Sequence, residues 1–304
     1  MTLAFNNIGS LGRLGNQMFE YAALRGIAAK HGYEWCIPPA DYNHLANYDI
    51  HSFELKNLKK EGFINSIINE QSSHSFEGLC SLNPNIKTIR ENGFAFDKDL
   101  FENFEDESNL DGFCQTEKYF KHISNEIRED FTFNKDNLEP CQEFISSLDS
   151  PPIFLHVRRG DAVGKEDYHP IAPMSYYIEA LKRFDDDTPC FVFTDDLEWC
   201  KSQEYFQSDR FLFNENVERY EYQSRDGLGR IQNTLLPHVD MCLMSLCSGG
   251  IIVNSSFSWW GAWLQNDRGK IIAPNPWFGP SASDLDTSDI IPDRWEIIDW
   301  SLLE

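Results

Sequence analysis

The second half of the chain alternates short apolar runs with longer segments in which apolar residues recur at helical spacing. The apolar runs predict strands at 153–157, 190–193, 211–213, 250–253 and 271–273. Helices are predicted near 174–184, near 233–247 and directly after 254–257. Strands that alternate with helices form parallel sheets. The predicted fold class is therefore α/β, and the run 271–273 is expected to close the sheet before Pro274.

The N-terminus has the same order of strand, loop and helix. A short strand at 3–8 leads into a glycine-rich loop at 9–17, and apolar residues at helical spacing continue from there to Gly32. Such a loop can present backbone N–H groups to an anion at the start of a helix. Its glycine spacing fails the dinucleotide-binding fingerprint, and it lacks the Gly-Lys-Ser/Thr of a P-loop. Glycines that serve only a tight turn also explain the loop.

Between these two regions the pattern weakens. Residues 41–135 show poor periodicity, with a helix predicted at 119–130, and residues 134–152 are polar and end in Pro151-Pro152. A polar segment of this kind is typical of an interdomain linker. At 304 residues the chain also exceeds the size at which single hydrophobic cores stop growing. We therefore predict an N-terminal domain at 1–150 and a C-terminal domain at 151–304.

Polar residues follow three of the predicted strands, at the edge where parallel sheets bind ligands. They are His156, Arg158 and Asp161, then Thr194, Asp195 and Asp196, then Asn254, Ser255 and Ser256. Because the carboxyl ends of parallel strands share one edge, we expect the three turns to converge. The aspartates and serines could instead serve only as caps of the helices that follow.

The pair Arg158-Arg159 carries a chemical signal of its own. Arginine stays charged and is rarely buried without a negative partner, so two arginines at a strand exit predict a phosphate-bearing ligand. Pairing with carboxylates on an exposed turn is the alternative in a chain of formal charge -23. That charge argues against nucleic acid as a partner, since phosphates require a basic face. A small anionic ligand would need a local basic pocket.

The composition gives no sign of a membrane anchor or a metal site. No apolar stretch approaches the roughly 20 residues that span a bilayer, and the first residues do not resemble a signal peptide, so we expect a cytoplasmic protein. The eight cysteines lack metal-ligand spacing and are expected as reduced thiols. Asp97 and Asp99 could hold a divalent ion against a diphosphate, but carboxylates at this spacing also arise by chance in an acidic chain.

Three blocks of sequence occur in a recognisable order. They are 12–19 (GRLGNQMF), 156–161 (HVRRGD) and 240–263, and 276–278 and 292–295 continue the pattern. Together they resemble the α-1,2-fucosyltransferases of glycosyltransferase family 11. The resemblance implies a GT-B architecture of two facing Rossmann-like domains, with the nucleotide mostly on the C-terminal one. It also implies inverting transfer of L-fucose from GDP-β-L-fucose to the 2-hydroxyl of a terminal β-galactoside, with no metal and no cofactor.

The segment 156–171 is also similar to its counterpart in the α-1,6-fucosyltransferases. That similarity implies that His156 and Asp240 read the guanine. It further implies that Arg158 holds the β-phosphate of the donor and that Ser256 assists. Arg159, Ser255 and Asp196 are expected to contribute to the same nucleotide site.

The reaction needs a general base to accept the proton of the acceptor hydroxyl. The same similarity assigns this role to Glu166, but the lysine that partners the glutamate in that group is replaced here by Ala162. His169, in the same loop, is the second candidate. Asn16, by resemblance to the protein O-fucosyltransferases, is expected to face the fucose or its phosphate.

Acceptor contacts are expected from the irregular region 41–135, where the sequence shows no motif. Three other functions stay open. The chain could transfer fucose to another position, or it could bind a GDP-sugar without catalysis. A nicotinamide-dependent dehydrogenase is the third possibility, which the glycine spacing disfavours.

Overall fold

The computed structural model describes residues 2–8, 11–37, 87–213, 222–225, 231–234 and 237–303. The chain folds as two compact units. Unit 1 comprises Met1–Asn134, Gln223–Asn233 and Asp286–Pro292, and unit 2 comprises Lys135–Tyr222, Thr234–Leu285 and Asp293–Glu304. The chain thus first leaves unit 1 after Asn134 and later returns to it twice, whereas the sequence suggests a single boundary between 150 and 151.

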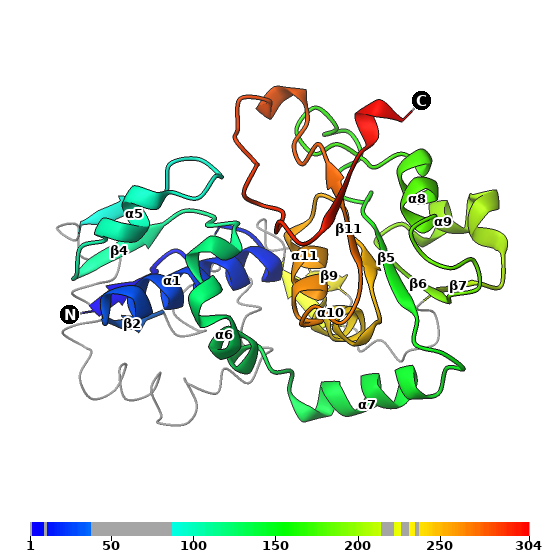
Figure 1. Ribbon diagram of the computed structural model, residues 1–304, viewed down its shortest axis with the longest axis horizontal. Coiled ribbons are helices and arrows are strands. Elements are labelled where there is room, and N and C mark those ends of the chain that lie inside the picture. Colours follow the sequence, from blue (N-terminus) through cyan, green and yellow to red (C-terminus); the bar gives the residue numbers. More distant parts are fainter. Residues whose placement is uncertain are drawn as a thin grey trace. The chain divides into compact units, whose positions relative to one another are not determined.

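Unit 1 contains a parallel sheet of four described strands in the order β2-β1-β4-β3 (Figure 1). The strands are β1 (Thr2–Ala4), β2 (Glu34–Cys36), β3 (Thr88–Arg90) and β4 (Ser108–Asp111). The helices are α1 (Leu14–His31), α5 (Lys98–Asn103) and α6 (Ser124–Asp130). β1 and β4 are neighbours in the sheet although far apart in the sequence, so the segments that leave their carboxyl ends meet.

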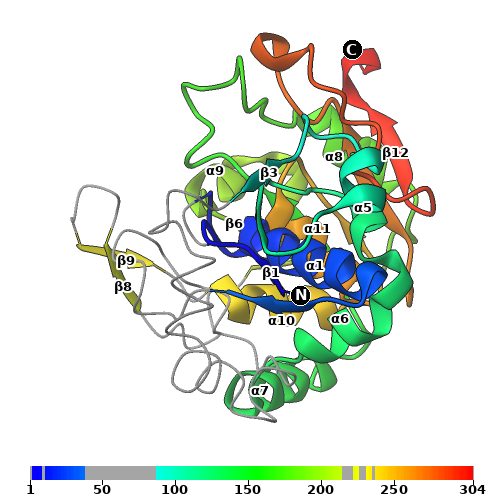
Figure 2. The ribbon, with the colours of Figure 1, turned by 90° about the vertical axis from the view of Figure 1, so that its left-hand side faces the viewer.

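Helix α1 is held in unit 1 by close packing and by a buried ion pair. A Cβ at Gly26 would lie 2.8 Å from the Cα of Phe120, so only glycine allows this approach of the two backbones. Arg25 Nε pairs with the buried carboxylate of Asp130 in α6 at 2.8 Å, and the Tyr21 hydroxyl donates to the same oxygen at 3.0 Å. Figure 2 shows α6 beside α1 (blue).

Unit 2 contains a six-stranded parallel sheet in the order β12-β11-β10-β5-β6-β7. The strands are β5 (Ile153–Val157), β6 (Cys190–Thr194), β7 (Phe211–Phe213), β10 (Gly250–Ile251), β11 (Ile271–Asn275) and β12 (Glu296–Asp299). The helices are α7 (Lys135–Ser146), α8 (Met174–Leu181), α9 (Leu197–Ser202), α10 (Pro237–Leu246) and α11 (Ser256–Trp263). Strands β8 (Tyr222–Arg225) and β9 (Ile231–Thr234) form a separate two-stranded sheet, most of whose residues belong to unit 1.

The strand order of unit 2 reverses between β5 and β10. From β5 the chain continues to β6 and β7 in one direction, and from β10 it continues to β11 and β12 in the other. In open α/β sheets a ligand binds outside the carboxyl ends of the strands at such a reversal. The topology therefore places the candidate site of unit 2 where β5 and β10 end.

The alternation of side chains along β5 decides which residues reach which face of the sheet. Ile153, Leu155 and Val157 belong to the apolar core that also contains Tyr176 of α8. Phe154 and His156 point to the other face, where α10 and α11 lie (Figure 1). A Cβ at Gly250 would come within 2.5 Å of the Phe154 ring, so glycine in β10 leaves room for that ring.

The predicted α/β class is confirmed, and both units are Rossmann-like in having parallel strands linked by helices. The predicted strands and helices of unit 2 are present, with bounds that differ by a few residues at most. In unit 1 the helix predicted at 119–130 is instead two 3-10 turns, Glu117–Tyr119 and Lys121–Ile123, followed by α6. No described helix is long and apolar enough to cross a membrane.

Two predictions about unit 2 are wrong. The segment predicted as a linker is largely the helix α7, whose Cys141 is buried and whose Phe144 ring lies 5.5 Å from that of Phe191. Its polar composition hides one apolar face. The sheet also does not close at β11, because β12 pairs beyond it. β12 is an edge strand in which Ile297 is exposed, so this strand does not appear in the sequence as a regular apolar run.

Candidate functional site

Arg158 joins the ends of β5 and β10. Its Nη1 donates to the carbonyl oxygen of Asn254 at 3.0 Å. Its Nε and Nη2 donate to the two carboxylate oxygens of Asp161 at 2.9 and 3.0 Å. These contacts use all three nitrogens of the guanidinium and hold it from two sides, and the second N–H of Nη1 and of Nη2 has no partner within the described parts of the chain. The charge is thus held in a fixed direction at the point where the strand order reverses.

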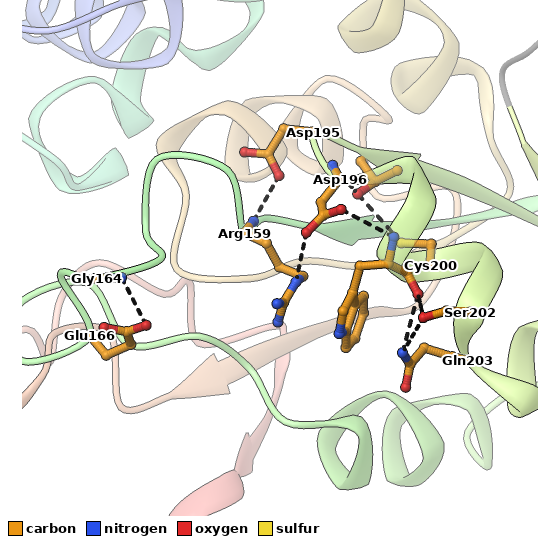
Figure 3. Close-up of polar contacts among 10 residues, drawn as sticks. Arg159, Gly164, Glu166, Asp195, Asp196, Cys200, Ser202 and Gln203 are labelled. Carbon is orange, nitrogen blue, oxygen red and sulfur yellow. Dashed lines mark hydrogen bonds and ion pairs between the residues drawn. The ribbon is translucent and has the colours of Figure 1, made fainter.

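Arg159 has a different environment from Arg158. Its backbone N–H donates to Asp195 at 2.7 Å, and its Nε pairs with Asp196 at 3.1 Å (Figure 3). Its guanidinium lies over the ring of Trp199, 4.2 Å from the ring centre. Asp196 also caps α9, because its Oδ1 accepts from the N–H of Trp199 at 3.1 Å. The expected capping role of Asp196 is therefore present, and the same carboxylate restrains Arg159.

His156 is nearly buried, with 8% of its surface exposed. Its ring lies 6.0 Å from that of Phe257 in α11, and Nδ1 has no hydrogen-bond partner among the described residues. The pKa of His156 is lowered to about 4, chiefly by burial and also by the charge of Arg158, while Asp195 and Asp161 oppose the change. The ring is neutral at pH 7, with a buried polar atom for which a ligand could provide the partner.

The start of α11 completes this edge of the sheet. Ser255 is buried and occupies the N-cap position, but its side chain makes no capping hydrogen bond. Ser256 is the first residue of the helix. The side-chain amide of Asn254 donates to the carbonyl oxygen of Pro170 at 3.0 Å, which ties this turn to the loop after β5. The backbone N–H groups and the dipole of α11 therefore favour an anion beside Arg158.

Asp240 lies in the first turn of α10 and is partly buried. Because α10 leads directly into β10, it runs antiparallel to the strands, and its first turn lies toward their carboxyl ends. This is the edge that carries His156 and Arg158. The following residues Met241 and Leu243 are buried, as the apolar pattern of this helix suggests.

The loop after β5 contains both candidates for the general base. Glu166 is exposed, and its Oε1 accepts from the N–H of Gly164 at 2.9 Å (Figure 3). Hydrogen bonds from the N–H groups of Gly164 and of Glu166 itself lower the pKa of this carboxyl. His169 is partly buried, and its pKa is lowered by burial and then by the charge of Arg158. His169 thus lies within electrostatic reach of the arginine, and its ring is mainly neutral at pH 7.

The backbone of this loop is fixed by the turn that follows β11. The N–H of Gly279 donates to the carbonyl oxygen of Tyr168 at 3.0 Å, and Ser281 donates to that of Asp167 through its N–H and its hydroxyl. A Cβ at Gly279 would lie 2.6 Å from the carbonyl carbon of Asp167. The backbone of the loop that contains Glu166 and His169 is therefore held in a defined position within unit 2.

Asn16 lies in unit 1, in the first turn of α1. Its Nδ2 donates to the carbonyl oxygen of Leu11 at 3.3 Å, and its Oδ1 accepts from Nε2 of Gln115 at 2.9 Å. Gly12 has a φ of +136°, and a Cβ there would lie 2.8 Å from the Asn16 Cγ. This glycine thus serves both the turn and the close approach of Asn16. Gly9 lies outside the described residues.

Sequence reasoning overlooks Gln115. It follows β4, a strand with the sequence Ser-Asn-Leu-Asp that contains one apolar residue and so gives no strand signal. In the sequence, the apolar Leu110 followed two residues later by Gly112 gives only a weak hint of a strand and a turn. The structure brings Gln115 together with Asn16, and it brings Arg158, Asp161 and the Asn254 turn together in unit 2.

The carboxylates considered for a metal have other roles. Asp97 caps α5, since its Oδ1 accepts from the N–H of Leu100 at 2.9 Å. Asp99 accepts from the side-chain amide of Asn103 at 2.7 Å. Within the described ranges no group of three or more His, Cys, Asp or Glu side chains is arranged to hold a metal ion.

Comparison with known proteins identifies the family. Residues 3–298 match the profile of the family described as Glycosyl transferase family 11. The chain belongs to this family. An alpha-1,2-colitosyltransferase of Escherichia coli is 32% identical over 306 residues, which cover 93% of this chain and 95% of that protein. The galactoside alpha-(1,2)-fucosyltransferase 1 of Homo sapiens is 26% identical over 268 residues, which cover 83% of this chain and 63% of that protein.

Two solved structures are similar over most of the chain. One is NodZ, an alpha-1,6-fucosyltransferase soaked with GDP-fucose, with a TM-score of 0.44, 13% identity, and coverage of 86% of this chain and 92% of that one. The other is POFUT1 in complex with GDP-fucose, with a TM-score of 0.47, 10% identity, and coverage of 89% and 96%. The family itself is shown by the profile match, in agreement with the motifs at 12–19, 156–161 and 240–263.

The buried ring of His156 leads to a prediction about pH. In the folded protein its pKa is about 4, against 6.5 for an ordinary histidine, so between these values the unfolded chain binds more protons than the folded one. Stability contributed by the neutral ring is therefore present above pH 6.5 and is lost as the pH falls toward 4. NMR titration of the histidine Cε1–H signals, with His156→Gln to assign the resonance, should give a midpoint near 4. A midpoint near 6.5 would show that the ring is not desolvated.

Proposed function

We propose that this protein is an α-1,2-fucosyltransferase that transfers L-fucose from GDP-β-L-fucose to the 2-hydroxyl of a terminal β-galactoside, with inversion at the anomeric carbon. The observation that carries the proposal is the fixed guanidinium of Arg158 beside the start of α11, at the reversal of strand order. A cation and a helix N-terminus at that point suit a diphosphate. The identity to galactoside α-1,2-fucosyltransferases supports this choice of linkage.

In this proposal Arg158 and α11 stabilise the leaving group. The bond between the fucose C1 and the β-phosphate oxygen breaks, and negative charge develops on GDP. The N–H groups of Arg158 that do not bind Asp161 or Asn254 donate to that oxygen, and the helix dipole adds to the stabilisation. No divalent ion is needed in this scheme, since the arginine supplies the positive charge.

The nucleotide base would be recognised by His156 and Asp240. A neutral imidazole with a buried Nδ1 can exchange a hydrogen bond with the guanine edge at little desolvation cost, because the ring is already out of water. The Asp240 carboxylate would accept from guanine N1–H and N2–H, which adenine does not offer. Ser255 and Ser256 would donate hydroxyl hydrogen bonds at the start of α11. Arg159, held by Asp196, would add positive charge beside the phosphates.

Glu166 is the proposed general base, and Asn16 in unit 1 would contact the fucose or its phosphate. The carboxylate of Glu166 would take the proton of the acceptor hydroxyl as its oxygen attacks the anomeric carbon. The hydrogen bonds that lower the pKa of Glu166 also make it a weaker base. His169 therefore remains the second candidate, because its imidazole is neutral and lies in the field of Arg158.

A second donor deserves a direct comparison. The Escherichia coli relative with 32% identity is a colitosyltransferase, and colitose is fucose without the 3-hydroxyl. A site that donates or accepts a hydrogen bond at that hydroxyl would reject the deoxy sugar, whereas an apolar site would not reject it strongly. The alternative function is thus transfer of colitose from its GDP derivative by the same residues.

Assays with both donors test the proposed activity. Purified protein is incubated with GDP-fucose or GDP-colitose and a panel of terminal β-galactosides, and the product linkage is determined by NMR. We expect α-1,2-linked fucose, with GDP-fucose preferred in kcat/KM. A preference for GDP-colitose would assign the second function. Binding of GDP-fucose without transfer or hydrolysis, across the whole panel, would leave only a binding protein.

Arg158→Lys tests the leaving-group role. Lysine keeps the charge but cannot engage Asp161 and Asn254 while it contacts phosphate, so we expect kcat to fall by roughly 100-fold to 1,000-fold. Arg294→Lys, at a pair with Asp267 in the same unit, is the matched control and should retain activity. Chelator should not change the wild-type rate. A loss that Mn²⁺ or Mg²⁺ restores would contradict metal independence.

Glu166→Gln and His169→Gln distinguish the two candidate bases. We expect Glu166→Gln to lower kcat by roughly 100-fold or more with an unchanged Kd for GDP, since only proton transfer is removed. The exposed Glu198→Gln in α9 serves as the control. If Glu166→Gln turns over at the wild-type rate and His169→Gln does not, the base is His169.

A further inference from the structure

The boundary between β1 and β4 in unit 1 is bridged by side chains, as the reversal between β5 and β10 is in unit 2. Asn16 follows β1 and Gln115 follows β4, and the hydrogen bond of 2.9 Å between them joins the two exits. Gln115 is 7% exposed, so its amide is fixed by its surroundings. The position of Asn16 therefore depends on the path of the chain after β4.

That path is strained. Gly112 has a φ of +154°, and Cys114 has a φ of +49°, a left-handed conformation that a residue with a Cβ adopts at a cost. Cys114 is completely buried, and its carbonyl oxygen accepts from the N–H of Thr116 at 2.8 Å. A turn of this kind persists only where its surroundings hold it. The residue directly after the strained position is Gln115.

Glu91, which follows β3, supplies what holds the turn. Its Oε2 accepts from the N–H of Cys114 at 2.7 Å, and its Oε1 accepts from the hydroxyl of Tyr119 at 3.0 Å. Its own N–H donates to the carbonyl oxygen of Asp111 at 2.9 Å. A Cβ at Gly112 would lie 2.6 Å from the Glu91 Cβ, so the turn passes directly over this side chain.

We propose that Glu91 is a positioning residue for sugar transfer, and that its carboxylate holds the Cys114 turn so that Gln115 keeps Asn16 in place. The inference rests on the proposed function in one respect, namely that Asn16 contacts the donor. Glu91 itself touches neither substrate in this scheme. Its effect passes through one backbone hydrogen bond and one side-chain hydrogen bond, both within unit 1.

The charge state of Glu91 makes the proposal testable. Burial raises its pKa to about 7, against the hydrogen bonds from Cys114 and Tyr119, which lower it, and with a further increase from Asp97. Above this pH the carboxylate accepts strongly from the Cys114 N–H, and below it the added proton weakens that bond. The position of Gln115 and Asn16 should therefore loosen as the pH falls through about 7.

Other titratable groups lie near Glu91. Burial and the charge of Glu91 raise the pKa of both the Cys114 thiol and the Tyr119 hydroxyl, so these two keep their protons. Asp111 and Glu20 face the Cys114 thiol. Asp111 is paired with Arg90 at 2.7 Å.

The main experiment compares wild type with Glu91→Gln as a ratio of kcat at each pH, which cancels the other ionisations of the enzyme. At about pH 8.5 the wild type should be roughly tenfold faster, since it alone has the charged acceptor. At about pH 5.5 the ratio should approach one. Glu126→Gln, an exposed glutamate of α6, should give a ratio of one throughout. The Kd for GDP should change little, because in the proposed function His156, Arg158 and Asp240 of unit 2 hold the nucleotide.

Tyr119→Phe gives a second readout that a purely structural role would not change. Loss of the hydroxyl removes a hydrogen bond that lowers the pKa of Glu91. When the kcat of Tyr119→Phe is divided by that of Glu91→Gln at each pH, the midpoint of this ratio should therefore lie at higher pH than for the wild type. A ratio for the wild type that does not vary with pH would overturn the positioning role. So would a midpoint that Tyr119→Phe leaves unchanged.

Amide hydrogen exchange separates this inference from the proposed function. At about pH 8.5 the segment 112–116 should exchange faster in Glu91→Gln than in wild type, and at about pH 5.5 the two should agree. Equal exchange at both pH values would refute the contact, whatever the enzyme transfers. If the wild type transfers no sugar from any GDP donor, the proposed function fails, and the exchange result alone then decides whether Glu91 positions the turn.

Discussion

The arrangement of the strand ends in unit 2 depends on the partners of Arg158, an arginine that stays charged. Arg158 stands at the reversal of strand order, and its guanidinium is held by Asp161 on one side and by the Asn254 carbonyl on the other. Because the first partner follows β5 and the second follows β10, the arginine links these two segments, which the hydrogen bond from Asn254 to Pro170 also joins. A reversal of strand order is where open α/β sheets bind ligands, and the arginine places a positive charge there.

The alternation of side chains along β5 determines which residues surround Arg158. Residues 153, 155 and 157 fill the apolar core on one face of β5, so the intervening His156 must face α11. Burial there keeps its ring neutral beside a permanent cation. One strand thus supplies a neutral hydrogen-bonding group and, two residues later, a charged one. A shift of one residue in the pairing of the strand would turn both side chains to the other face of the sheet, so the chemistry of this site depends on the register.

Sequence reasoning succeeds where elements are long and their apolar pattern is regular. The strands β5, β6 and β11 are buried runs, and the polar turns after β5 and β10 could be located because strand exits share an edge. It fails for elements stabilised by contacts distant in sequence. β2 and β3 are three residues each, β12 is a half-exposed edge strand, and α7 is recognisable only by the face that it buries. Glu91 follows β3, and Gln115 follows β4, which has a single apolar residue, so no local pattern marks either of them.

The acidic chain raises the question of how an anion could bind beside so many carboxylates. Asp161, Asp195 and Asp196 surround the two arginines, but each is already engaged: Asp161 and Asp196 form ion pairs with Arg158 and Arg159, and Asp195 accepts from the backbone N–H of Arg159. A carboxylate that forms an ion pair contributes little repulsion at a distance, because the pair is nearly neutral. Arg158 keeps N–H groups that neither Asp161 nor Asn254 uses, at least among the described residues, so a phosphate need not displace either partner. The start of α11 then provides the additional attraction, and the carboxylates serve to fix the direction of the charge rather than to cancel it.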